Sequence, residues 1–295
     1  MKDYHQYLHK QGYATSTINT YTRETSNFIQ WCKRRATAPE SIDYKTCLQY
    51  IKYLQRKKVS KRTVSLQLGC IKKYLDYLVT HHYRISNPIE DTIIKGVKRV
   101  INYTLLTPDE LEDLYYSYQT DTYLEEYHKY TAKRDKMIIG LLVYQGLATK
   151  DFTTLKLEHL QIHKGKLYIP SSKKSNAREL ELKPWQIMEC MEYVNEVRDI
   201  LIQRLKNYTH TEQLFPSGDR FIIMDAVIKK IRKYNQKVKN AKQIRASVIT
   251  NWLQQHNLRK VQYMAGHRYI SSTERYLTDD LENLHEIVNN FHPIR

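Results

Sequence analysis

The chain has 295 residues, of which 41% are hydrophobic and 27% charged, a balance typical of globular proteins with room for two domains. Its net charge of +17 indicates a polyanionic partner, because each lysine or arginine that neutralises a phosphate releases counterions. Residues 1–100 hold 19 basic and 7 acidic residues, so the excess charge is concentrated in the N-terminal third. We find no apolar run of bilayer-spanning length and no apolar leader, which argues against a membrane or secreted protein.

The four cysteines stand far apart, at Cys32, Cys47, Cys70 and Cys190, and none forms a CxxC pair. This spacing argues against a zinc site, so we expect neither a metal nor a cofactor. Scattered cysteines fit a reducing compartment, and we expect the first three to be packed inside helices. The chain is therefore expected in the bacterial cytoplasm.

Residues 1–97 have the pattern of a helical domain. In the first predicted helix, residues 15–35, apolar positions recur at a three-or-four spacing: Ile18, Tyr21, Phe28 and Trp31. Further helices are predicted over residues 46–56 and from Ser60 onward. The pair Asn87-Pro88 predicts the start of a short fourth helix.

Basic side chains follow the polar faces of these helices. The seven candidates for DNA contact are Arg56, Lys57, Lys58, Lys61, Arg62, Lys72 and Lys73. Such a run can be an ordinary solvated face. Because this one lies in the most basic third of the chain, we favour contacts to DNA phosphates.

A second domain is predicted over residues 105–295, after a linker at residues 98–104. Its first helix begins at Thr107-Pro108, where threonine can cap the helix, proline suits the first turn, and Glu110 completes a capping box.

Most of this second domain is predicted to be helical, with one small hairpin. A buried helix is expected over residues 137–144, and strands over residues 164–170 and 178–182 flank a polar turn. Further helices are predicted from Pro184 and over residues 241–255, 259–264, 272–276 and 280–291; the last is amphipathic. The fold class is therefore mainly α with a small β-sheet, in two domains.

A short C-terminal motif singles out one of the 25 tyrosines. Gly266-His267 is followed nine residues after the histidine by Tyr276, and a Ser/Ser/Thr run at residues 271–273 between them predicts a helix start. The histidine would lie on a loop and the tyrosine on the next helix. With Arg245 upstream, these residues can bind a phosphodiester, hold its charge and attack it.

With these elements in order, the chain resembles the tyrosine recombinase (phage integrase) family in both domains. The matching segments are Ala265-Gly266-His267 with Tyr276, Arg245-Ala246-Ser247, Gly146-Leu147 followed by Leu155 and Leu157, and Lys173-Lys174 in the hairpin turn. The resemblance implies a SAM-like, core-binding N-terminal domain and a catalytic domain behind it.

Two positions depart from the family pattern. Ala148 stands where the family has its first arginine, and Lys242 stands where it has the histidine of His-x-x-Arg. The chain resembles some members from the Bacteroidetes group, which share this divergent style with Gln-Ile-Arg-Ala-Ser. The departures put activity in doubt, since losing one preorganised donor costs about 10²–10³ in rate. Lys150 or Arg178 is a candidate to substitute in part for the missing arginine.

The resemblance also implies roles for the remaining residues. Tyr276 would form a 3′-phosphotyrosine link, with Arg245 and His267 on the phosphate. Lys173 would protonate the leaving 5′ oxygen, with Lys174 as a close rival, and Lys242 would bind phosphate. Each also has a plain structural reading: a core aromatic, a surface ion pair, a structural histidine or simple surface lysines.

The implied function is site-specific recombination or integration of duplex DNA by a homotetramer on the bacterial nucleoid. The helix over residues 280–291 would pack into a neighbouring protomer or into its own. Two alternatives stay open: a weakened or silent DNA-binding protein on the same scaffold, and a type IB topoisomerase that relaxes supercoils as a monomer.

Overall fold

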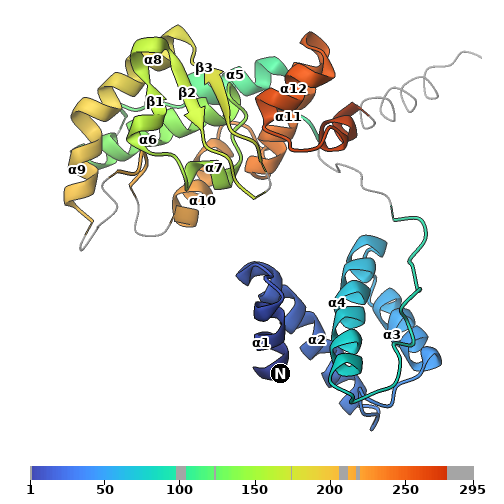
Figure 1. Ribbon diagram of the computed structural model, residues 1–295. Helices are drawn as coiled ribbons and strands as arrows, with labels where there is room; N and C mark the ends of the chain where they lie inside the picture. The colour runs from blue at the N-terminus through green and yellow to red at the C-terminus, as the bar shows by residue number, and fades with distance from the viewer. Residues whose placement is uncertain are drawn as a thin grey trace, which may run out of the picture. The chain divides into compact units, whose positions relative to one another are not determined.

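The computed structural model describes residues 2–97, 104–122, 124–173, 175–205, 212–216 and 220–277. The chain divides into two compact units, Met1–Arg99 and Val100–Arg295 (Figure 1). None of the helices described is both long and apolar enough to cross a membrane. The helical architecture with a small sheet confirms the predicted fold class.

The N-terminal unit is built from four helices: α1 (Lys2–Lys10), α2 (Thr15–Lys33), α3 (Tyr44–Arg56) and α4 (Lys61–Thr80). The side chains of Asp43 and Ser60 accept hydrogen bonds from the first turns of α3 and α4, which fixes where these helices begin. The three longer helices confirm the predicted ones, while α1 was not predicted. Tyr50 packs edge-on against Phe28 and Trp31, each at 5.0 Å between ring centroids.

The short helix predicted after Asn87-Pro88 was wrong: residues 88–91 form turns. The Asn87 side chain does not cap a helix. It accepts a hydrogen bond from the Ile89 N–H and donates one to Asp76 Oδ1, at 2.7 Å. It also donates to the carbonyl of Lys72, so the asparagine ties this segment to α4.

Cys32, Cys47 and Cys70 are buried in α2, α3 and α4, as predicted. Burial raises the pKa of each of these thiols to about 11, which leaves them protonated and inert at neutral pH. They fill the apolar interior of this unit.

The C-terminal unit begins with α5 (Pro108–Tyr116), whose Thr107–Glu110 capping box is present as predicted. Its other helices are α6 (Glu126–Val143), α7 (Thr149–Phe152), α8 (Pro184–Glu192), a π-helical turn (Tyr193–Val197), α9 (Arg198–Gln203), α10 (Arg220–Ile231), α11 (Ala241–Gln255) and α12 (Leu258–Ala265). The chain is helical again at 271–277. The predicted helix over residues 280–291 lies outside the described residues.

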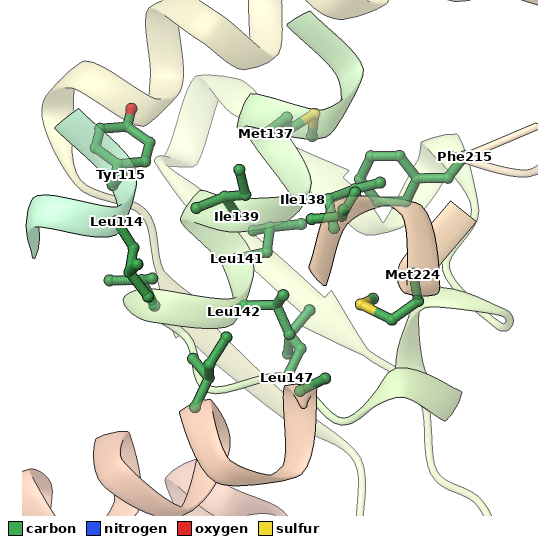
Figure 2. Packing of buried hydrophobic residues seen from close by; sticks show 14 of the residues in the cluster. Leu114, Tyr115, Met137, Ile138, Ile139, Leu141, Leu142, Leu147, Phe215 and Met224 are labelled. Atoms are coloured by element: carbon green, nitrogen blue, oxygen red, sulfur yellow. The ribbon is translucent and has the colours of Figure 1, made fainter. Parts of the chain in front are cut away.

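The core of this unit surrounds α6. Consecutive residues Met137, Ile138 and Ile139, then Leu141 and Leu142, are all buried, so the helix is covered on every side (Figure 2). Helices α5, α8 and α11 contact it. A helix buried this completely gives a rigid base for the loop that follows it.

The sheet has three antiparallel strands in the order β1 (Leu160–Gln161), β2 (Lys166–Ile169) and β3 (Arg178–Glu181). Short 3₁₀ turns at Leu157–His159 and Ile162–Lys164 flank β1. Strands β2 and β3 confirm the predicted hairpin, with Ile169 opposite Arg178. Side chains alternate along β3, so Arg178 and Leu180 are buried while Glu179 and Glu181 are not.

Candidate active site

Arg245 on α11 joins two loops of the C-terminal unit. Its guanidinium donates to the carbonyl of Gly146, which follows α6, and to the carbonyl of Ala265 at the end of α12, at 2.6 Å. The first loop can approach so closely because residue 146 is a glycine with φ +54°; a Cβ there would lie 3.0 Å from Val248. Two neutral carbonyls hold this arginine and leave its charge uncompensated.

His267 lies on the loop after α12, as predicted. Its Nδ1 is 2.9 Å from Thr273 Oγ1, and its ring is stacked on Tyr276 with 5.9 Å between centroids and 13° between planes. Burial, followed by the charges of Arg245 and Arg178, lowers the pKa of His267 to about 4. The imidazole is therefore neutral at neutral pH.

The predicted helix start after this loop is confirmed, because the chain is helical at 271–277. The hydroxyls of residues 271–273 were expected to cap this helix. The buried Thr273 hydroxyl instead forms a hydrogen bond with His267 Nδ1. It therefore orients the imidazole.

Tyr276 is half-buried and packs against a small apolar cluster of Ile249, Val261 and Ala265 from α11 and α12. Burial and the neighbouring Arg178 lower the pKa of Arg245, while Asp151 and Tyr276 raise it. The tyrosine therefore lies within electrostatic reach of Arg245 in the same chain.

Arg178 enters the same site from β3. Only 2% of it is exposed, and its Nη2 donates to Asp151 Oδ2 at 2.8 Å. The same carboxylate oxygen accepts the backbone N–H of Ala148 at 3.0 Å. The remaining nitrogens, Nε and Nη1, are buried without a hydrogen-bond partner.

The hairpin turn that carries Lys173 is attached to the His267 loop. Ser175 pairs with His267 in an isolated antiparallel bridge, and the Asn176 N–H donates to the carbonyl of Gly266 at 3.0 Å. Lys173 itself is exposed in this turn, and Lys174 lies outside the described residues.

Lys242 and Lys150 are exposed and line one cavity of about 480 Å³ together with Arg245 and Ala148. The structure therefore brings Arg245, His267 and Tyr276 together and places two lysines beside them. Among the described residues, no group of three or more His, Cys, Asp or Glu is arranged to hold a metal ion.

Sequence reasoning missed Asp151 and Thr273 as partners of the site, and treated Arg178 only as a possible substitute. One signal was available for the arginine. Residues 178, 180 and 182 share a face of the predicted strand, so an arginine aligned with two leucines points inward. Nothing in the sequence distinguishes Asp151 from a helix-capping carboxylate.

In the N-terminal unit, the basic candidates form two groups. Arg56, Lys57, Lys58, Lys61 and Arg62 are exposed where α3 ends and α4 begins. Farther along α4, Lys72 donates its amine to the carbonyl of Glu90 at 2.6 Å, and Lys73 lies over the ring of Tyr13.

A tyrosine beside a buried arginine, a half-buried arginine and a neutral histidine, on a helical unit with a small hairpin, defines the class of the tyrosine recombinases. The chain belongs to the Phage integrase family, whose profile matches residues 104–283, and residues 1–85 match its N-terminal SAM-like domain. It is thus an enzyme of DNA strand breakage and rejoining.

Among curated relatives, the chain is 23% identical to tyrosine recombinase XerC of Thermodesulfovibrio yellowstonii over 292 residues, 97% of this chain and 93% of that protein. It is 22% identical to XerC of Staphylococcus epidermidis, over 96% and 93% of the two chains. Among solved structures, it is similar to XerH recombinase bound to difH substrate (TM-score 0.70, 18% identity, 92% and 79% covered). A lambda integrase dimer on a COC′ core site also matches (TM-score 0.68, 14% identity, 95% and 76% covered).

Proposed function

We propose that this chain is a site-specific recombinase or integrase that cleaves duplex DNA through a 3′-phosphotyrosine link at Tyr276. The observation that carries the proposal is an excess of buried positive charge beside the tyrosine. Arg178 pairs with the carboxylate of Asp151, Arg245 is held by two neutral backbone carbonyls, and His267 is neutral. A buried charge of this sign needs an anion, and a phosphodiester supplies one.

The residues fit an in-line transfer. The Tyr276 oxygen attacks phosphorus and loses its proton, with His267 Nε2 as the acceptor or as a donor to a phosphate oxygen. As the new P–O bond forms, the bond to the 5′ oxygen breaks, and that oxygen takes a proton from Lys173. Arg245 and Lys242 neutralise the phosphate charge. The reverse reaction with another 5′ hydroxyl rejoins the strand, so the bond energy is conserved.

Duplex DNA is the proposed partner. The XerH and lambda integrase structures hold recombinases on DNA, and this chain has their fold and a net charge of +17. In the N-terminal unit, the exposed basic residues between α3 and α4 are suited to phosphate contacts. We place the enzyme on the nucleoid in the cytoplasm, acting as a homotetramer in which residues 280–291 pack against a neighbour or their own chain.

The test uses nicked duplexes tiled over the DNA that flanks the coding sequence, so that the short released fragment with the free 5′ hydroxyl diffuses away and the covalent complex is trapped. We expect a detergent-stable band shift that is absent with Tyr276→Phe. If no duplex gives a Tyr276-dependent complex although DNA is bound, the chain is a silent DNA-binding protein. Relaxation of supercoils without strand exchange would instead identify a topoisomerase.

A further inference from the structure

Arg178 is the strongest feature of the site that the proposed chemistry leaves unused. The side chain is almost wholly buried, yet only its Nη2 has a partner, the carboxylate of Asp151. Nε and Nη1 are buried without any hydrogen bond. Native proteins rarely leave buried donors unpaired, and on a charged group the cost is larger still.

A purely structural ion pair does not explain this arrangement. Arg178 lies close enough to Arg245 and His267 for its positive charge to lower the pKa of both. Asp151 pairs with the buried Arg178, whereas the half-buried Arg245 donates to two backbone carbonyls. A bound anion would satisfy the two unpaired nitrogens and the positive charge together.

The Arg178 guanidinium lies near the backbone of residue 148. Asp151 Oδ2 accepts both the Ala148 N–H and Arg178 Nη2, so the guanidinium lies within two hydrogen-bond lengths of the backbone at position 148. Position 148 is where the family pattern has its first arginine. Here the residue is alanine, and an arginine from β3 is linked to its backbone N–H through Asp151.

We propose that Arg178 is a catalytic residue that binds a nonbridging oxygen of the scissile phosphate through one of its two unpaired nitrogens, Nε or Nη1, in place of an arginine at position 148. This inference rests on the proposed function. Asp151 holds the guanidinium through Nη2, at 2.8 Å. Gly266 makes room for it, because a Cβ there would lie 2.9 Å from Arg178 Cζ.

The test compares a phosphate with a methylphosphonate at the scissile position of the same nicked duplex. A methylphosphonate replaces one nonbridging oxygen by a methyl group, so the diester loses its negative charge. On the phosphate, Arg178→Ala is expected to lower the rate of covalent trapping about 100- to 1000-fold. On the methylphosphonate, the same substitution is expected to cost far less, because the charge that Arg178 neutralises is gone.

A matched control separates this from a folding defect. Arg198 is likewise buried in the C-terminal unit, but it donates to the carbonyl of Gln213 at 2.7 Å. Arg198→Ala is expected to lower the melting temperature and to change trapping by the same factor on both duplexes. Arg178→Lys, which keeps the charge, provides a variant that preserves the pairing with Asp151.

The outcomes are distinct. If Arg178→Ala and Arg178→Lys trap both duplexes at the wild-type rate, or lose the same factor on both, Arg178 has no contact with the phosphate charge and the inference is wrong. If the wild-type enzyme itself forms no covalent complex on any duplex, the proposed function fails, and the inference fails with it.

Discussion

Replacing Gly266 with alanine should reduce cleavage by displacing Arg178, in addition to straining the backbone. Residue 266 ends α12 at φ +67°, which costs about 1–2 kcal/mol for a residue with a Cβ. The added methyl group would lie 2.9 Å from Arg178 Cζ and 3.1 Å from its Cδ, inside ordinary contact. Because the guanidinium is buried and paired with Asp151, it cannot move without breaking that bond.

The assay is covalent trapping on a nicked duplex, beside a thermal melt. Gly165→Ala is the matched control: it has φ +62° in the same unit, but its Cβ would meet only the flexible end of Ile187 at 3.3 Å. We expect both variants to lose comparable stability, and only Gly266→Ala to lose trapping by about 100-fold or more.

A double variant tests the route of this effect. If Gly266→Ala acts through Arg178, then adding it to Arg178→Ala should slow trapping no further, because the displaced group is already absent. The reasoning is refuted if Gly266→Ala traps DNA as fast as Gly165→Ala does. It is also refuted if the double variant loses trapping by the product of the two single losses.

Three further predictions follow from the site and the basic face. Lys173→Ala should slow cleavage about 10²–10⁴-fold and be rescued by a 5′-bridging sulfur, since a thiolate leaves without a proton; rescue of Lys174→Ala instead would reassign the acid. Because the pKa of His267 is lowered to about 4, the unfolded chain binds more protons than the folded one between that value and 6.5. The free energy of unfolding should therefore fall as the pH drops through this window, and His267→Asn should flatten the profile; an unchanged slope would contradict the burial of a neutral imidazole. In a salt titration of DNA binding, Arg62→Ala should reduce the slope of log K by about 1, whereas Lys72→Ala, whose amine is held by Glu90, should leave it unchanged; equal changes would contradict the division of the basic residues.

Much of the fold follows from local sequence signals. Short-range hydrogen bonds made by Ser60 and by the Thr107–Glu110 capping box mark where two helices begin. The alternation along residues 178–182 marks a strand by its spacing alone. The failures have the opposite origin. Asn87 looks like a helix start, but its side chain finds partners on α4, and this competing tertiary contact is invisible in a local window.

The same limit applies to the active site. The spacing from His267 to Tyr276 identifies both residues because a loop and one helical turn fix their distance along the chain. Asp151 could not be assigned in this way, because its role depends on a strand residue, Arg178, 27 positions away. Thr273 looked like a cap, and only the folded loop turns its hydroxyl toward the imidazole.

The central claim is that Tyr276 becomes covalently joined to a 3′ phosphate, in a pocket whose charge comes from Arg245 and Arg178. The most direct measurement is mass spectrometry of the complex trapped on a nicked duplex, after digestion of protein and DNA. The account predicts one peptide, containing residue 276, that carries a nucleotide, and no such peptide from Tyr276→Phe. A nucleotide on another tyrosine, or an unmodified residue 276 in a detergent-stable complex, would contradict it.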